Sequence, residues 1–296
     1  MTNRQRLYAG FAVYIAVTIL FVLIVGSSGR NETFEPQNEF KLDPWINLPG
    51  PFDINKAVVY VIAAAAITVW AMVYIARRMQ DRPNRVQTIV ETLYTVMRDN
   101  ITRNNMDDSM AAKWFPFIAT LFLFIWISNL IGYIPLPTNT EHPIHVLGLE
   151  IPAFAIYAAT ANLSVPLVLA IVVFVGYTVE GVRAKGPIGY LKGLVPSGVT
   201  GGLAVILFVL ELFSNIMRLI SLSVRLFANI LAGHLIILFM AGGIAVLLGT
   251  AAVAWVTLPF GVILFIFEVG LVATLQAFIF ATLASIYFGG AVAHDH

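Results

Sequence analysis

Long apolar runs recur along this chain of 296 residues and determine the architecture that its sequence predicts. A helix needs about 20 mostly apolar residues to cross the hydrocarbon layer of a bilayer, which is about 30 Å thick. Residues 7–26 and 57–76 form the first two such runs. Residues 114–140 and 151–179 carry no charged side chain, and each stretch can contain one more spanning helix. The first two thirds of the chain therefore predict four membrane passages.

From residue 193 to residue 293 the chain is apolar except for a few ionisable residues. This stretch is long enough for two extended helices with a break near residues 249–259, which include a glycine and a proline. We therefore predict an all-α, polytopic membrane protein with six membrane-embedded helices, of which the last two form a long hairpin. We expect a single membrane domain over residues 1–296, with an outer loop at 27–56 and a helical core at 57–293.

The first apolar run allows two interpretations. Its basic start at Arg4 and Arg6, its apolar centre and the small residues at 26–28 also suit a cleaved signal peptide. However, the run is long for the apolar region of a signal, and no clear Ala-x-Ala cleavage site follows it. We favour an additional N-terminal span in residues 1–26.

Residues 86–101 follow a different pattern. Their apolar positions recur at the spacing of one face of an α-helix, whereas polar residues occupy the other faces. Such an amphipathic helix is expected to lie along the membrane interface, with its apolar side in the lipid. A helix of a small soluble lobe is the weaker alternative, because no second apolar segment lies nearby. The apolar face comprises Val86, Ile89, Val90, Leu93, Tyr94, Met97 and Ile101.

Composition supports the membrane assignment. Hydrophobic residues make up 59% of the chain and charged residues only 11%, whereas soluble domains carry about a quarter charged residues. Mean hydropathy is +0.87. The net charge of +1 implies no nucleic-acid partner. The absence of cysteine excludes disulfides and thiolate metal sites.

Lysine and arginine residues in the short loops predict the orientation of the chain. Basic residues precede the first and third runs, at Arg4, Arg6 and Lys113, and follow the second and fourth, at 77–85 and 183–192. All of them lie on one side if both termini are cytoplasmic. The opposite loops are acidic or nearly neutral. We therefore expect a multi-pass protein of a bacterial plasma (inner) membrane with both termini in the cytoplasm.

Ionisable side chains inside membrane helices are unfavourable, by about 2.5–3.5 kcal/mol for a central arginine on insertion scales, and therefore indicate functional sites. On the fifth expected helix, charged residues recur every seven positions, which drifts by only about 20° per step. His234 lies nine residues beyond this series, or about 900° of helical rotation, and therefore on the opposite face. The series and two serines close to its stripe are Glu211, Ser214, Arg218, Ser221 and Arg225.

An arginine within such a path cannot relay protons, because its guanidinium does not release its proton in proteins. A fixed cation at Arg225 repels a travelling proton or sodium ion, and it can pair with a carboxylate of another subunit. The residues alone therefore indicate two offset half-paths separated by an arginine barrier. The structural alternative is an ion pair between Glu211 and Arg218, with Arg225 extending to an interface.

His234 alone fits a hydrogen-bonded core histidine as well as a proton relay. Glu268 on the last helix favours the relay, because a carboxylate inside the membrane needs a partner and His234 is the obvious one. Measured from the ends of the expected turn, the two residues lie at depths of about 22 and 14 Å. Direct contact therefore requires an axial offset between the helices, or a bridging water.

The sequence around these residues resembles the ATP synthase subunit a family. The run from Ser221 to His234, Ser-Leu-Ser-Val-Arg-Leu-Phe-Ala-Asn-Ile-Leu-Ala-Gly-His, carries the resemblance, and its arginine motif is highly specific. Two other matching segments are Ser128-Asn-Leu-Ile-Gly132, before Pro135, and Leu275-Gln-Ala-Phe-Ile-Phe280. The amphipathic segment also occupies the position where the family has one. The likeness covers roughly residues 53–289.

The resemblance implies that Arg225 is the essential stator arginine, facing the carboxylate of a rotor c-ring. It implies a cytoplasmic half-channel lined by Glu211, with Ser214, Arg218 and Ser221 on the same stripe. The outer half-channel would be lined by Asn229, His234, Glu268 and Gln276, together with Asn162, which we expect on the fourth helix.

The resemblance further implies a subunit that is not an enzyme on its own and holds no cofactor or metal. Its partners would be the c-ring, the peripheral-stalk b subunits, other ATP synthase subunits and membrane lipid. The sequence has no phosphate-binding Gly-Lys-Ser/Thr loop, so we expect no nucleotide to bind.

The sequence departs from the family pattern in two places. Glu268 lies eight residues before Gln276, where seven are expected, and this difference turns Glu268 by about 100°. A helix bulge or another alignment would account for the extra residue. The additional span before Ser27 is also absent from many members of the family.

Three alternative functions are weaker. A secondary transporter with an anionic substrate at Arg225 is expected to show internal repeats, and the two halves of the chain show none. A quinone-linked subunit of a proton-pumping redox complex should lack the arginine-asparagine-histidine run. A sodium-coupled synthase is disfavoured, because a sodium path needs oxygen ligands rather than a titrating histidine.

Overall fold

The computed structural model describes most of the helical core. The first expected span and most of the outer loop lie outside the described residues, so their predictions stay predictions. The described residues are 5, 13, 16, 42, 44–46, 54–80, 83–134, 136–146, 149–155, 157–195, 198–243 and 251–292.

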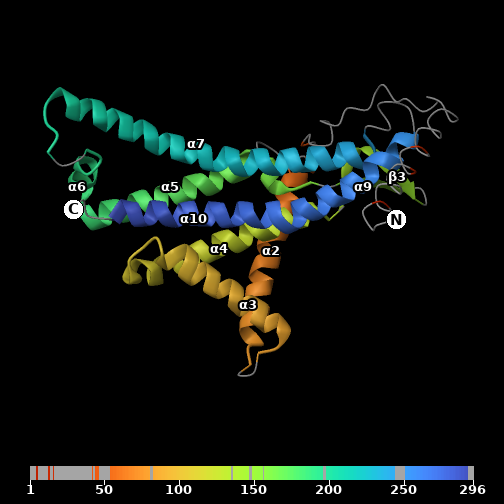
Figure 1. Cartoon of the computed structure of the whole chain (residues 1–296), viewed down its shortest axis with the longest axis horizontal. Coiled ribbons are helices and arrows are strands. Elements are labelled where there is room, and N and C mark those ends of the chain that lie inside the picture. The colour runs from red at the N-terminus through yellow and green to blue at the C-terminus, as the bar shows by residue number, and fades with distance from the viewer. Residues whose placement is uncertain are drawn as a thin grey trace. The chain divides into compact units, whose positions relative to one another are not determined.

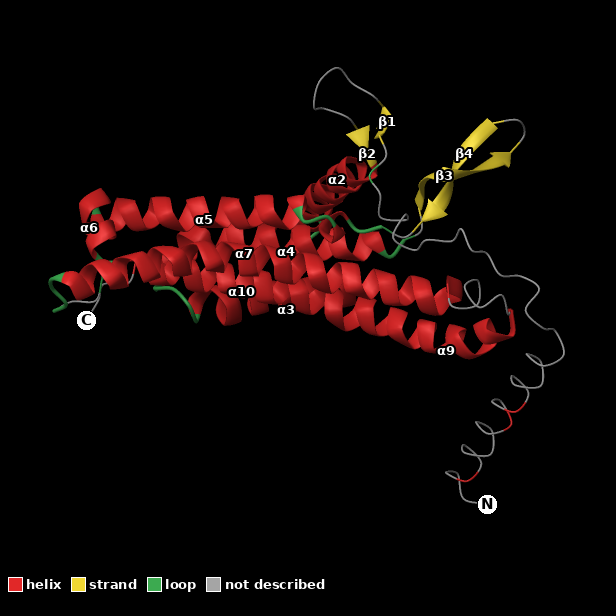
Figure 2. Ribbon diagram, turned by 90° about the horizontal axis from the view of Figure 1, so that it is seen from above, coloured by secondary structure: helices red, strands yellow, loops and turns green. Residues whose placement is uncertain are grey.

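The described chain consists mainly of helices, accompanied by two small antiparallel hairpins (Figure 2). The strands are β1 (Pro44–Ile46), β2 (Ile54–Asn55), β3 (Leu136–Val146) and β4 (Leu149–Ala155). The α-helices are α2 (Lys56–Arg77), α3 (Arg85–Thr95), α4 (Asp108–Gly132), α5 (Ser164–Lys185), α6 (Pro187–Lys192), α7 (Gly202–Leu238), α9 (Ala251–Phe267) and α10 (Ala273–Val292). Three short segments of the described chain are π-helical, η2 (Val96–Arg103), η4 (Phe239–Gly243) and η5 (Glu268–Val272), and one is a 3₁₀ turn, η3 (Ala159–Ala161).

Five helical segments among the described residues are long and apolar enough to cross a membrane, and they confirm the prediction of an all-α polytopic membrane protein. They are α2, α4, α5, α7 and the segment Thr257–Val292. The hairpin β3–β4, which pairs Leu136 with Ala155 and Val146 with Leu149, was not predicted. In the sequence, Pro135 and Pro137 follow within five residues of the end of the third helix at Gly132, and each lacks the N–H that a continuing helix would need.

The described residues fall into two compact groups. The larger comprises the described residues within 57–134, 158–230 and 273–296, and the smaller comprises those within 1–56, 135–157 and 231–272. In the larger group, α10 packs against α4 and α5 (Figure 1). Small residues permit this packing: a Cβ added at Gly176 would lie 2.8 Å from the Phe288 ring. The buried small residues of α10 are Ala273, Ala277, Ala281, Ala284 and Ser285.

The amphipathic segment forms the expected helix, as α3 continued by the π-helical η2. The Asn84 side chain caps it by accepting a hydrogen bond from the Gln87 backbone N–H, at 2.8 Å. The later part of its apolar face is buried in the larger group, at Met97 and Ile101. The earlier part, at Val86 and Ile89, stays more than 60% exposed, as a helix lying in a membrane interface requires.

The break before the last helix was predicted too late in the sequence. Helix α9 begins at Ala251 and contains Pro259, which we expected to lie within the break. The preceding helix already ends at Leu238 and passes into a π turn. Proline is tolerated inside membrane helices, where neighbouring groups can satisfy the carbonyl that it leaves free, so Pro259 is not a reliable signal for a turn.

Candidate functional site

Helix α7 carries most of the predicted site residues. Its sequence from Gly202 to Leu238 has no proline and is dominated by leucine, isoleucine, alanine and valine, which allows one unbroken helix of 37 residues. Only 6% of its most apolar window is buried. The helix therefore presents much of its surface to lipid or to a partner.

Arg218 is held by side chains of its own group. Its Nη2 donates a hydrogen bond to Glu211 Oε1 at 3.1 Å, and its Nη1 donates to Asn215 Oδ1 at 3.3 Å. The guanidinium carbon also lies 5.8 Å from the ring centre of Tyr287 on α10. The ion pair considered as the structural alternative is therefore present. Both side chains remain about 40% exposed, so the pair can still line an aqueous path.

Arg225, seven residues later, has different surroundings. It is exposed, and the part of the chain that the structure describes offers it no hydrogen bond or ion pair. The exposed residues around it recur every three or four positions, so they form one face of α7. This open face consists of Ile220, Ser221, Val224, Arg225, Ala228, Asn229 and Ala232.

A second constellation lies within the smaller group, at Gly233, His234 and Glu268. The side chains of His234 and Glu268 are buried, with 3% and 9% of each residue exposed. The Glu268 carboxylate lies so close to Gly233 that a Cβ at that position would overlap it. The absence of a side chain at Gly233 therefore gives the carboxylate room beside the backbone of α7. The Glu268 carboxylate thus lies beside the residue that directly precedes His234.

Glu268 begins the π turn η5, which runs to Val272. A π turn contains one more residue than an α turn, so it absorbs the extra residue counted between Glu268 and Gln276. The helix bulge, one of the two explanations predicted from the spacing, is confirmed. Gln276 lies beyond the bulge on α10 and is 6% exposed.

We expected Asn162 on the fourth membrane helix, and this prediction was wrong. Asn162 precedes α5, and its side-chain oxygen accepts a hydrogen bond from the Ser164 backbone N–H at 2.9 Å. Asparagine suits such a position because its side chain can satisfy an amide at the start of a helix. Pro166, in the first turn of α5, is a further sequence signal for this start.

Sequence reasoning missed one buried polar connection. Asn129 on α4 is fully buried, accepts a hydrogen bond from the Thr160 hydroxyl at 2.7 Å and donates to the Ala273 carbonyl at 3.2 Å. Trp126 donates to the Thr274 hydroxyl at 3.0 Å. These bonds fix α4 to the first turn of α10. Asn129 appeared in the family motif, but its partners lie far away in sequence, so no local signal could identify them.

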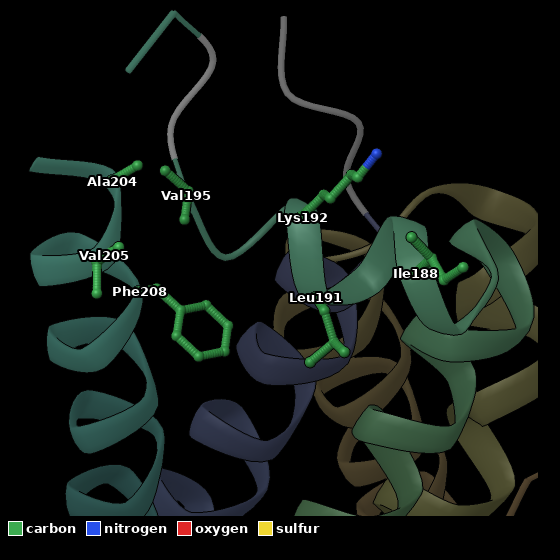
Figure 3. Close-up of a pocket in the computed structure, with 7 residues that line it drawn as sticks. All are labelled: Ile188, Leu191, Lys192, Val195, Ala204, Val205 and Phe208. Atoms are coloured by element: carbon green, nitrogen blue, oxygen red, sulfur yellow. The ribbon is translucent and has the colours of Figure 1, made fainter. Parts of the chain in front are cut away.

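The cavities contribute little to this site. One pocket, of about 370 Å³, lies between α6 and the start of α7 and is lined by six apolar side chains and Lys192 (Figure 3). It contains none of the predicted channel residues. No cluster of histidine, cysteine, aspartate or glutamate suited to a metal ion occurs among the described residues.

Comparisons with known proteins confirm the family that the sequence resembles. The sequence profile of the family described as ATP synthase A chain matches residues 58–289. The chain is 36% identical to the ATP synthase subunit a of Rubrobacter xylanophilus, over 79% of this chain and 82% of that protein. It is 34% identical to the subunit a of Parvibaculum lavamentivorans, over 91% and 97%, and to that of Pelagibacter ubique, over 88% and 98%.

Proposed function

The chain belongs to the ATP synthase subunit a family, and from that premise we propose that it carries protons to and from a rotating c-ring through two offset half-paths. As a member of the family it is a membrane-sector subunit of an F-type ATP synthase. Each charge that crosses gains about 2.3 kcal/mol per 100 mV. Rotation driven by this energy leads to ATP formation in the soluble sector, so this subunit is not an enzyme on its own.

The observation that carries the proposal is the open position of Arg225. A permanent cation on a membrane helix is unfavourable unless it has a partner. Arg225 has none within the described residues and lies on an exposed face of α7. A carboxylate presented by another subunit would satisfy it. A rotor carboxylate that passes Arg225 would have to release its proton on one side and gain another on the other side.

Two groups of polar residues serve the half-paths in this proposal. On the cytoplasmic side they are Glu211, Ser214, Arg218 and Ser221. On the outer side they are Asn162, Asn229, His234, Glu268 and Gln276. Histidine titrates near neutral pH in its unperturbed state, which suits uptake of protons from water. The burial of His234 and of Glu268, and the close approach of Glu268 to Gly233, support the outer assignment.

The proposed setting is the inner membrane of a bacterium, with both termini in the cytoplasm. The proposed partners are the c-ring, the peripheral-stalk b subunits and further synthase subunits, as the family membership suggests. That membership also favours the synthase subunit over the secondary transporter. Extraction in mild detergent should recover a c-ring and soluble ATPase subunits together with this chain.

The test of the proposal is ATP-driven acidification of inverted membrane vesicles that contain the complete complex. Arg225→Ala should abolish acidification, although the variant chain still inserts and assembles. Immunoblots of the washed membranes check assembly. Full coupled pumping by the assembled variant would contradict the proposed role of Arg225 as the barrier between the half-paths. It would also contradict the two-path mechanism.

A further inference from the structure

A buried carboxylate that the proposed half-paths do not use lies on α5. The Glu180 side chain is only 8% exposed and forms an ion pair with Lys113 on α4. Its second oxygen, Oε2, is buried and has no hydrogen-bond partner within the described part of the chain. The Lys113 side chain, in contrast, is 52% exposed. The pair therefore connects an unsatisfied buried oxygen to a side chain that reaches the surface.

Two other buried polar atoms near this pair lack hydrogen-bond partners among the described residues. They are the Tyr177 hydroxyl, one turn before Glu180 on α5, and the indole nitrogen of Trp114, next to Lys113. Both rings lie against Phe288, with centroid distances of 6.5 and 4.2 Å. An unpaired buried polar group costs about 1–3 kcal/mol, and buried water commonly satisfies such groups. The cluster is therefore suited to hold water beside Glu180.

Ring contacts connect this cluster to the arginine–glutamate pair on α7. The Tyr177 and Tyr287 ring centroids are 5.8 Å apart, and the Arg218 guanidinium carbon lies 5.8 Å from the Tyr287 ring centre. Arg218 in turn binds Glu211. Ring contacts thus link Arg218 on α7, by way of Tyr287 on α10, to Tyr177 on α5, one turn before Glu180. All of these residues belong to the larger compact group.

We propose that Glu180 is a proton-carrying residue at the exit of the cytoplasmic half-path and that Lys113 positions it; this inference rests on the proposed function. During ATP synthesis a proton arriving through water from the Glu211 region binds Glu180 Oε2 and then leaves to cytoplasmic water, and during ATP-driven pumping the same steps run in reverse. Lys113 keeps its own proton and holds the other carboxylate oxygen. Each passage therefore returns both residues to their starting state. The basic residues at 183–192, which follow Glu180, predict that this end of α5 faces the cytoplasm.

The experiment compares variants in vesicles that contain the complete synthase, with ATP-driven acidification divided by the amount of assembled chain. Glu180→Gln keeps the size and hydrogen bonding of the side chain but cannot carry a proton. It should lower the rate about tenfold, equivalent to about 1.4 kcal/mol of additional barrier. Glu180→Asp should restore most of the rate. Arg183→Gln, which removes an exposed charge one turn further along α5, should leave the rate unchanged.

A purely structural ion pair predicts another result, namely less assembled complex with a normal rate per complex. If Glu180→Gln alone does not assemble, the double variant Glu180→Gln with Lys113→Gln, which leaves neither charge without its partner, is measured in its place. A normal rate per assembled complex in either variant would overturn the exit assignment, as would an aspartate variant no faster than the glutamine variant. If one of these outcomes occurs while Arg225→Ala is inactive in the same vesicles, the exit assignment fails and the proposed function stands. Pumping by Arg225→Ala would instead remove the proposed function itself.

Discussion

Helix α7 carries two arginines, seven residues apart, that differ in what neutralises them. Arg218 binds Glu211 and Asn215 and lies over the Tyr287 ring, so its charge is compensated within the chain. Arg225 lies on an open face without an ion pair among the described residues. Identical side chains at a heptad spacing can therefore have separate roles, and the one left without a partner is the better candidate for contact with another subunit.

Substitution by lysine at both positions should separate the two roles most strongly. Lysine keeps a positive charge, but unlike arginine it can lose its proton when buried, and it lacks the planar fork of donors. We expect Arg225→Lys to lose nearly all ATP-driven pumping, whereas Arg218→Lys, which can still pair with Glu211, should pump almost normally. Acidification of inverted vesicles measures both variants. Equal rates would contradict the distinction between the two arginines.

The next largest effect is expected at Gly233. A Cβ at this position would overlap the Glu268 carboxylate, so Gly233→Ala must displace that carboxylate from the backbone of α7. We expect a severe loss of potential-driven ATP synthesis, measured per assembled complex. Gly270→Ala is the matched control, because it lies in the same π turn as Glu268 and its Cβ would meet no described atom within 4 Å. Similar losses in both variants would indicate a general effect on helix packing.

The membrane helices were predictable because bilayer thickness sets their length. The five described spans follow from apolar runs alone, and the bulge at Glu268 follows from counting residues against the family pattern. Hairpin β3–β4 and the early end of α7 were not predictable in this way, since an apolar run contains a helix without defining its ends. Composition cannot show where irregular backbone replaces a helix.

The site was predictable in its residues but less so in their pairing. Heptad spacing placed Glu211 and Arg218 on one stripe and left open whether they pair; the structure shows that they do. The bonds from Asn129 to Thr160 and Ala273 join segments distant in sequence, and no helical period encodes them. Asn162 was misplaced because an apolar run was assumed to be helical throughout.

A smaller effect on ATP synthesis is expected when His234 is replaced. Unperturbed histidine has a pKa of about 6.5 and changes its charge within the physiological range. We predict that His234→Ala slows proton uptake from the outer side and changes its dependence on outer pH. Exchange of the two residues, with glutamate at 234 and histidine at 268, should restore part of the rate. The measurement is potential-driven ATP synthesis at outer pH from about 5.5 to 8.5. An unchanged rate and pH profile would make His234 a core histidine.

The smallest effect is expected from Arg218→Ala, which returns to the comparison of the two arginines. Removing Arg218 leaves Glu211 without its 3.1 Å partner, but Glu211 is about a third exposed and can be solvated. Pairs of this exposure contribute at most about 1 kcal/mol in water. We therefore expect pumping to fall by no more than severalfold, and Glu211→Gln combined with Arg218→Ala should recover part of that loss, because it removes the unpaired carboxylate. Acidification by the single and double variants gives the coupling between the two side chains. If Arg218→Ala were as inactive as Arg225→Ala, the ion pair would belong to the barrier itself, and α7 would hold one continuous functional stripe in place of two distinct arginines.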